Sequence, residues 1–143
     1  MTGPPFFVYG TLRAGGAHHD AFLRGRTAGP PVAAVLPGAA LYEGPGYPYA
    51  VLEAADGTLG AAAGELVTAA PGAYAGLLAA LDRLEGFTVP GARNNLYERV
   101  YGPTRTDRGV TVMAWVYVAP PDLAAELRAH GRRVPHDDWR ARP

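Results

Sequence analysis

The segment PFFVYGTLR (residues 5–13) joins a short apolar run to a loop that contains glycine. Phe6, Phe7 and Val8 in succession predict a short buried strand, which ends at Gly10. The backbone leaves the sheet at this glycine, so we expect the next N–H groups of the chain to lie in an exposed loop. This strand and loop are the first candidate for a functional site.

A second segment, residues 71–85, is the one clear amphipathic helix. Its apolar residues recur at spacings of three and four, at Tyr74, Leu77, Leu78, Leu81 and Leu84. Pro71 suits the first turn of such a helix, and Gly86 suits its C-terminal cap. At about 100° per residue, Glu85 lies roughly 20° around the helix from Tyr74, at the edge of the apolar stripe.

The position of Glu85 predicts an unusual carboxyl group. Burial disfavours the charged form, and so does the partial negative charge at a helix C-terminus, so both effects raise its pKa. A carboxyl group with a pKa near neutrality can accept and return a proton, as general acid/base catalysis requires. The alternative is that Glu85 ends the helix at the surface with its carboxyl group in water, and periodicity alone does not decide between them.

The rest of the chain predicts short strands and two further short helices. Strands are expected at 32–41, bent at Pro37-Gly38, and at 49–52, 64–67, 97–101 and 110–118, with a tight loop at 44–48 and a turn at Asp56-Gly57. The strand at 110–118 is apolar on both faces, which predicts a central strand buried on both sides. Helical segments are expected at 17–23 and 122–130, and a loop at 89–95. Residues 134–143 are expected to form a polar tail.

The composition excludes several kinds of chemistry. The 143 residues contain no Cys, Ser or Lys, which excludes disulfides, thiolate metal sites, Ser or Cys nucleophiles and Schiff-base lysines. Proton transfer must therefore come from Asp, Glu, His, Tyr or Thr. The length and the 48% hydrophobic content predict a single α+β domain, residues 1–143.

Charge and hydropathy limit the expected partners and location. The net charge is zero and the 13 arginines are scattered, so nucleic-acid or membrane binding is not expected as a main role. The chain has no apolar run of membrane-spanning length and no signal-peptide pattern at its start, which favours a cytoplasmic protein. Rich use of Ala, Gly, Pro and Arg suggests a bacterium with a GC-rich genome.

The order of several motifs resembles the gamma-glutamylcyclotransferase-like superfamily, in particular its AIG2-like and gamma-glutamylamine cyclotransferase branch. The resemblance implies a small mixed β-barrel flanked by helices. It also implies intramolecular aminolysis, in which the α-amine of a gamma-glutamyl group attacks the side-chain carbonyl and releases 5-oxoproline and an amine. The motifs are YGTLR (9–13), Gly16 with His18 and His19, Leu41-Tyr42 with Gly46-Tyr47-Pro48, GELV (64–67), LDRLEGF (81–87), LYER (96–99), AWVY (114–117) and Asp138-Trp139.

The resemblance implies roles for individual residues and no cofactor. Glu85 would be the general base and acid, and backbone N–H groups at Gly10, Thr11 and Leu12 would stabilise the developing oxyanion or the substrate carboxylate. Further substrate-binding candidates are Tyr9, Arg13, Tyr42, Tyr47, Pro48, Tyr97 and Tyr117. Arg13 would meet a substrate carboxylate, and Tyr97 and Tyr117 would aim their hydroxyl groups at the substrate; simple packing or solvation is the alternative for each.

Other residues and functions remain open at this point. Glu65 and Glu98 are rival carboxylates, which we expect to be structural or ion-paired. The clusters His18-His19 and His136-Asp137-Asp138 lack metal-ligand spacing, so no metal site is expected. The expected partner is a small gamma-glutamyl amine or amino acid; the sequence does not specify which one, nor the oligomeric state. A non-catalytic ligand-binding or protein-interaction domain of the same fold is the alternative function.

Overall fold

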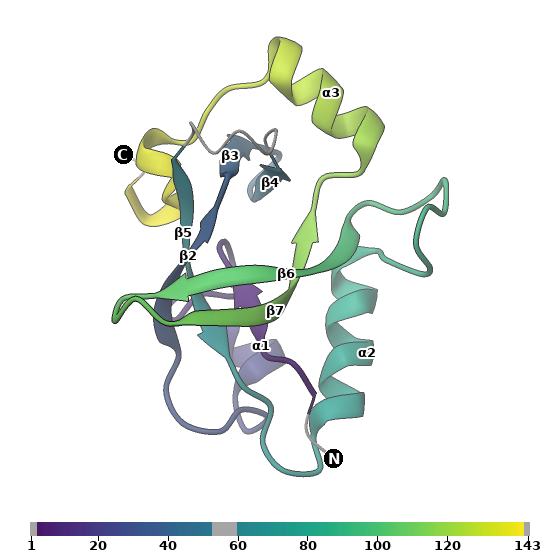
Figure 1. Cartoon of the computed structure of the whole chain (residues 1–143). Helices are drawn as coiled ribbons and strands as arrows, with labels where there is room; N and C mark the ends of the chain where they lie inside the picture. Colours follow the sequence, from purple (N-terminus) through teal and green to yellow (C-terminus); the bar gives the residue numbers. More distant parts are fainter. Residues whose placement is uncertain (1–2, 53–59, 142–143) are drawn as a thin grey trace.

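The centre of the structure is a closed barrel of five strands (Figure 1). The computed structural model describes residues 3–52 and 60–141. Around the barrel the strand order is β1-β5-β2-β6-β7. The barrel strands are β1 (Phe6–Val8), β2 (Val32–Pro37), β5 (Ala61–Val67), β6 (Glu98–Thr106) and β7 (Thr111–Val118).

The barrel is mixed, as the resemblance implied. Four of its neighbouring pairs are antiparallel, and a parallel contact between β1 and β7 closes the ring. At this contact Phe6 lies opposite Trp115, and the N–H of Trp115 donates to the carbonyl of Pro5 at 2.9 Å. The expected α+β class with a small mixed β-barrel is therefore confirmed.

A two-stranded sheet of β3 (Ala39–Glu43) and β4 (Pro48–Leu52) lies beside the barrel. The predicted bend at residues 37–38 is confirmed, because β2 ends at Pro37 and Gly38 adopts a positive φ of 75° before β3 begins. The predicted turn at Asp56-Gly57 lies outside the described residues. Strand β6 begins at Glu98 and is longer than the predicted segment 97–101.

Three α-helices flank these sheets: α1 (His19–Leu23), α2 (Tyr74–Glu85) and α3 (Pro121–His130). The helix α2 begins three residues later than predicted, because Gly72 adopts a positive φ of 78° and the chain turns there. Its C-terminal end is as predicted: Gly86, with φ of 66°, caps the helix.

The apolar core has separate parts on the two sides of β1. Phe7 belongs to the cluster inside the barrel, with Leu36, Leu66 and Val116. Phe6 and Val8 face the other way, into a cluster that includes residues of α1 and α2. A third cluster lies beneath α3. The short first strand is therefore buried on both faces and joins the barrel to the helices that cover it.

Two expectations about the second half of the chain were wrong. Strand β7 is buried at its end but exposed at its start, where Met113 is 40% exposed, because this part of the β6–β7 hairpin has no helix over it (Figure 1). Residues 134–141 are no free tail. They form two 3₁₀ turns, Pro135–Asp137 and Trp139–Ala141, which are anchored by the buried side chain of Val134 and by a hydrogen bond from the N–H of Leu41 to Asp137.

Within residues 3–52 and 60–141, no helix combines the length and the apolar character needed to cross a lipid bilayer.

Candidate active site

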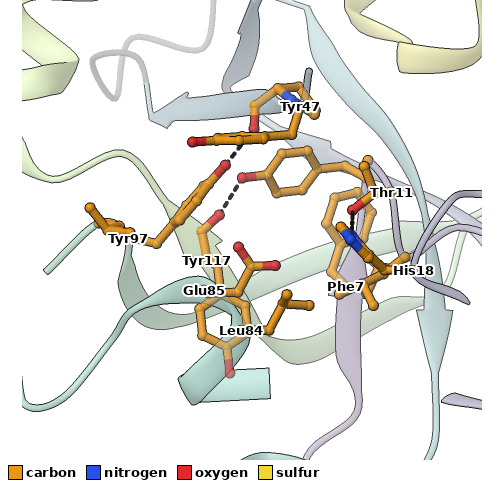
Figure 2. A pocket seen from close by; sticks show the side chains of 14 residues that line it. Phe7, Thr11, His18, Tyr47, Leu84, Glu85, Tyr97 and Tyr117 are labelled. Carbon is orange, nitrogen blue, oxygen red and sulfur yellow. Dashed lines mark hydrogen bonds between the residues drawn. The ribbon is translucent and has the colours of Figure 1, made fainter. Parts of the chain in front are cut away.

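A cavity of about 160 Å³ opens where the end of β1 meets the end of α2 (Figure 2). The strand end and its loop form one wall, and the start of β4 and the segment before β6 form another. The lining residues are Phe7, Val8, Tyr9, Gly10, Thr11, Leu12, His18, Tyr47, Pro48, Leu84, Glu85, Leu96, Tyr97 and Tyr117.

Glu85 lines this cavity as the last residue of α2. The left-handed Gly86 ends the helix, and the N–H of Phe87 donates to the carbonyl of Asp82 at 2.9 Å, which fixes the last turn. In Figure 2 the carboxyl group of Glu85 points toward the ring of side chains around the cavity. Burial among apolar and aromatic groups raises the pKa of Glu85 to about 7. The group can therefore exist in both protonation states near neutral pH.

The loop after β1 lines the same cavity and contains unpaired backbone donors. The carbonyl groups of Gly10 and Thr11 accept hydrogen bonds from the N–H groups of Arg13 (3.1 Å) and His18 (2.9 Å), so the loop folds back on itself. Among the described residues, no hydrogen bond has the N–H of Gly10, Thr11 or Leu12 as its donor. N–H groups without a partner in the protein are able to donate to a ligand oxygen that comes within hydrogen-bond distance.

Glycine is required at position 10 by a close approach. A Cβ atom there would lie 2.7 Å from Cδ and 2.9 Å from Cγ of Pro48. The absence of a side chain thus lets the start of β4 pack directly on the loop, and this contact forms one side of the cavity.

His18 lines the cavity, although the sequence pointed to it only as part of a family motif and as an unlikely metal ligand. Its Nδ1 atom lies 2.9 Å from Oγ1 of Thr11, and its ring packs edge-on against Phe22. The turn at residues 13–16 brings the side chain back toward the loop. No periodicity or spacing could have revealed this position, because it depends on how an irregular loop closes.

Tyrosine side chains form much of the wall, but their hydroxyl groups bond to the protein. Tyr9 donates to the carbonyl of Tyr117 at 2.5 Å and accepts from the N–H of Ala50 at 3.2 Å. Tyr97 donates to the carbonyl of Pro48 at 2.8 Å, and Tyr117 donates to Oδ1 of Asp82 at 2.6 Å. Burial raises the pKa of each of these three tyrosines, so they remain neutral. The structure thus differs from the expectation that the hydroxyl groups of Tyr97 and Tyr117 aim at a ligand.

The sequence from residue 6 to residue 141 matches the model of a protein family described as gamma-glutamyl cyclotransferase, AIG2-like. The chain belongs to this family. No curated protein matches the sequence.

Solved structures with the same fold come from distant organisms. YkqA from Bacillus subtilis is 22% identical with a TM-score of 0.64, and the match covers 97% of this chain but only 40% of YkqA. An AIG2-like protein from Mus musculus is 20% identical with a TM-score of 0.61, over 83% of this chain and 80% of that one. A protein of Arabidopsis thaliana, solved in solution, is 23% identical with a TM-score of 0.58, over 89% and 82% of the two chains. At these identities the likeness concerns the fold alone.

Two residues that the resemblance to this cyclotransferase family suggested for substrate binding do not line the cavity. Arg13 is 8% exposed; its Nη1 atom donates to Oδ1 of Asp138 at 2.7 Å, and its Nε atom lies 3.6 Å from Oε2 of Glu65. Tyr42 is buried in the cluster beneath α3, with the guanidinium group of Arg133 over its ring. The directions of both side chains are set by residues distant in the sequence: Asp138 and Glu65 for Arg13, and Arg133 for Tyr42.

The rival carboxylates lie elsewhere and are bonded to the protein. Glu65 accepts from the N–H of Ala14 at 2.9 Å and pairs with Arg140 at 3.1 Å. Glu98 accepts from the N–H of Gly91 and from the side-chain amide of Asn95. In the part of the chain that the structure describes, no three His, Asp or Glu side chains are grouped to hold a metal ion. Glu85 is therefore the one carboxyl group among the residues that line the cavity.

Proposed function

We propose that this chain is a gamma-glutamyl cyclotransferase, which converts the gamma-glutamyl group of a small gamma-glutamyl amine or amino acid to 5-oxoproline and releases the free amine. Glu85 acts as the general base and then as the general acid. The N–H groups of Gly10, Thr11 and Leu12 bind the developing oxyanion or the substrate carboxylate. Tyr9, Tyr47, Pro48, Tyr97 and Tyr117 shape the cavity through their rings and backbone.

One arrangement carries the proposal: a carboxyl group with a raised pKa and a row of unpaired N–H donors line the same small cavity. Proton transfer is most effective when the pKa of the catalytic group is near the working pH, and the pKa of about 7 meets this condition. Preorganised N–H donors are a common means of stabilising an oxyanion in acyl transfer.

The reaction needs no nucleophile from the protein, which agrees with the absence of Ser, Cys and Lys. The carboxylate of Glu85 takes a proton from the α-ammonium group of the substrate. The α-nitrogen then attacks the side-chain amide carbon, forming the ring C–N bond and a tetrahedral oxyanion. When the bond to the departing nitrogen breaks, Glu85 returns the proton to that nitrogen. In all, the α-nitrogen loses two protons, and both leave with the released amine as its ammonium form.

The walls of the cavity support ring closure by their shape and apolar character. The rings of Tyr97 and Tyr47 and the side chain of Leu84 line the same cavity as the carboxyl group (Figure 2). Holding the substrate folded places its amine near its own carbonyl carbon, so a five-membered ring forms from a prearranged contact.

The test is an assay for 5-oxoproline by mass spectrometry on a panel of gamma-glutamyl amines and gamma-glutamyl amino acids. We expect product from the unmodified protein and loss of at least about a hundredfold in rate for Glu85→Gln. The matched control is Glu126→Gln, the same change at an exposed position of α3, which should leave the rate unaltered. Equal product from Glu85→Gln would remove Glu85 from the mechanism. Absence of product across the panel would favour a non-catalytic binding domain.

A further inference from the structure

The cavity is polar at one end and apolar at the other. Thr11 and His18 lie on one side of the carboxyl group of Glu85, and Tyr97 lies on the opposite side (Figure 2). The proposed function assigns the unpaired N–H groups beside Thr11 to the oxyanion and the substrate carboxylate. The departing group then extends from Glu85 toward the end that Tyr97 and Tyr47 form.

Aromatic rings are packed together at this end. The rings of Tyr49 and Tyr97 stack with centroids 5.0 Å apart, and Tyr47 packs against both of them at 5.6 and 6.4 Å. The hydroxyl group of Tyr97 is occupied by the carbonyl of Pro48. The side chains of Tyr47 and Tyr49 form a hydrogen bond with each other. A ligand at this end therefore meets mainly ring carbon atoms, which favour apolar and aromatic groups.

Leu96 extends the apolar wall to the rim of the cavity. It is 61% exposed, yet its N–H donates to the carbonyl of Gly86 at 3.0 Å, and its side chain lies against the Cα of Gly86, next to Glu85. A large apolar side chain held in solvent beside the carboxyl group gains burial when a ligand covers it.

Among the described residues that line the cavity, none at this end carries a charge that could pair with a charge on the departing amine. Glu85 is the one acidic residue among the lining residues, and none of them is arginine. Two arginines of low exposure are engaged elsewhere: Arg13 with Asp138, and Arg99 with Asp82 and with the rings of Phe87 and Trp115. An ionised group without a partner is costly to place against apolar side chains.

Resting on the proposed function, we infer that the amine released by this chain carries an uncharged, apolar substituent, aliphatic or aromatic. A second carboxylate, as in an amino acid, or a second ammonium group, as in lysine, is disfavoured. The cavity of about 160 Å³ is smaller than the roughly 300 Å³ at which pockets for drug-sized ligands begin, so the substituent is also small.

The experiment compares matched pairs of substrates, in which one member lacks the charged groups of the departing amine: the carboxylate in two pairs, and both the carboxylate and the ammonium group in the lysine pair. Gamma-glutamyl-phenethylamide is gamma-glutamyl-phenylalanine without the carboxylate of the departing group, and gamma-glutamyl-isopentylamide bears the same relation to gamma-glutamyl-leucine. Gamma-glutamyl-n-pentylamide is the uncharged counterpart of gamma-glutamyl-ε-lysine. The value of kcat/KM for 5-oxoproline formation is measured for all six compounds with the full chain.

We expect the uncharged member of each pair to have a kcat/KM at least about tenfold higher, since each tenfold step corresponds to a modest desolvation cost. The carboxylate makes an amino acid the slightly better leaving amine, so intrinsic reactivity opposes this preference. Equal or faster turnover of the charged members would overturn the inference and leave the proposed function standing. No 5-oxoproline from any of the six would overturn the proposed function, and the inference with it.

A charge placed on the rim tests where the departing group lies. Leu96→Arg should lower, about tenfold, the ratio of kcat/KM for gamma-glutamyl-phenethylamide to kcat/KM for gamma-glutamyl-phenylalanine. The reason is that the guanidinium group would pair with the carboxylate of the departing phenylalanine. The matched control is Val89→Arg, which adds the same charge to the same loop at a residue that is 60% exposed and does not line the cavity. If both variants shift the preference equally, Leu96 does not contact the departing group and the inference fails.

Discussion

Replacing Arg13 with methionine tests whether this side chain serves the fold or the ligand. The guanidinium group is bonded to Asp138, 125 residues further along the chain, and lies 3.6 Å from the buried carboxylate of Glu65. Arg140 also pairs with Glu65 and donates to the carbonyl of Ala14. These contacts tie the loop after β1 to the C-terminal 3₁₀ turns.

The expected cost follows from the burial of the partners. Removing one member of a fully buried ion pair costs about 3–5 kcal/mol, because it leaves a charge without a partner. Here Asp138 is 31% exposed and Glu65 keeps Arg140 as a partner, so we expect the free energy of unfolding to fall by about 2 kcal/mol. The apolar stem of methionine fills most of the space of the arginine stem.

The assay is urea unfolding followed by circular dichroism, together with steady-state kinetics on the best substrate of the panel. The control is Arg24→Met, at an exposed position after α1, which should change the free energy of unfolding by less than about 0.5 kcal/mol. A tenfold rise in KM for Arg13→Met with no loss of stability would refute the reasoning, because it would mean that Arg13 binds the substrate carboxylate after all.

Three further predictions follow from the cavity. The value of kcat/KM should fall about tenfold per pH unit below pH 7, because the base must be deprotonated, and a profile flat down to pH 5 would contradict a pKa of about 7 for Glu85. The pKa of Glu85 in the folded state lies above the ordinary glutamate value of 4.5, so the folded state binds this proton more tightly than the unfolded state. Relative to Glu85→Gln, the unmodified protein should therefore be most stable below about pH 4.5, and its free energy of unfolding should fall by about 2 kcal/mol as the pH rises through 7. The check is urea unfolding of both proteins below pH 4.5 and above pH 7. If the difference between the two proteins is the same at both pH values, the raised pKa is excluded. Gly10→Ala should lower kcat/KM at least tenfold and stability by about 1–2 kcal/mol, because its Cβ would displace Pro48; unchanged kinetics would show that this contact does not shape the site.

Much of the fold could be predicted from local patterns. The apolar run before Gly10, the helical spacing from Tyr74 to Leu84 and the cap at Gly86 each describe a structure that depends on near neighbours in the sequence. The position of Glu85 at the edge of the buried face also follows from helix geometry alone. The β-barrel was predicted only from the family resemblance, because no local pattern in the sequence specifies how the strands pair.

Other features depend on partners distant in the sequence and could not be predicted. The directions of Arg13 and of the Tyr117 hydroxyl group are set by Asp138 and by Asp82, residues that the sequence analysis had no reason to bring close. The segment 134–141 is polar, yet it docks because Val134 finds a buried site and Asp137 accepts from the N–H of Leu41. Polar residues thus gave a misleading indication of a free tail.

The most direct measurement is an NMR titration of the glutamate side-chain carboxyl carbons in ¹³C-labelled protein, with the signal of Glu85 assigned by its absence from Glu85→Gln. We predict a midpoint near pH 7 for this signal. A midpoint near pH 4.5, the value of a hydrated glutamate, both with and without 5-oxoproline bound, would contradict the account of Glu85 as a proton carrier at neutral pH.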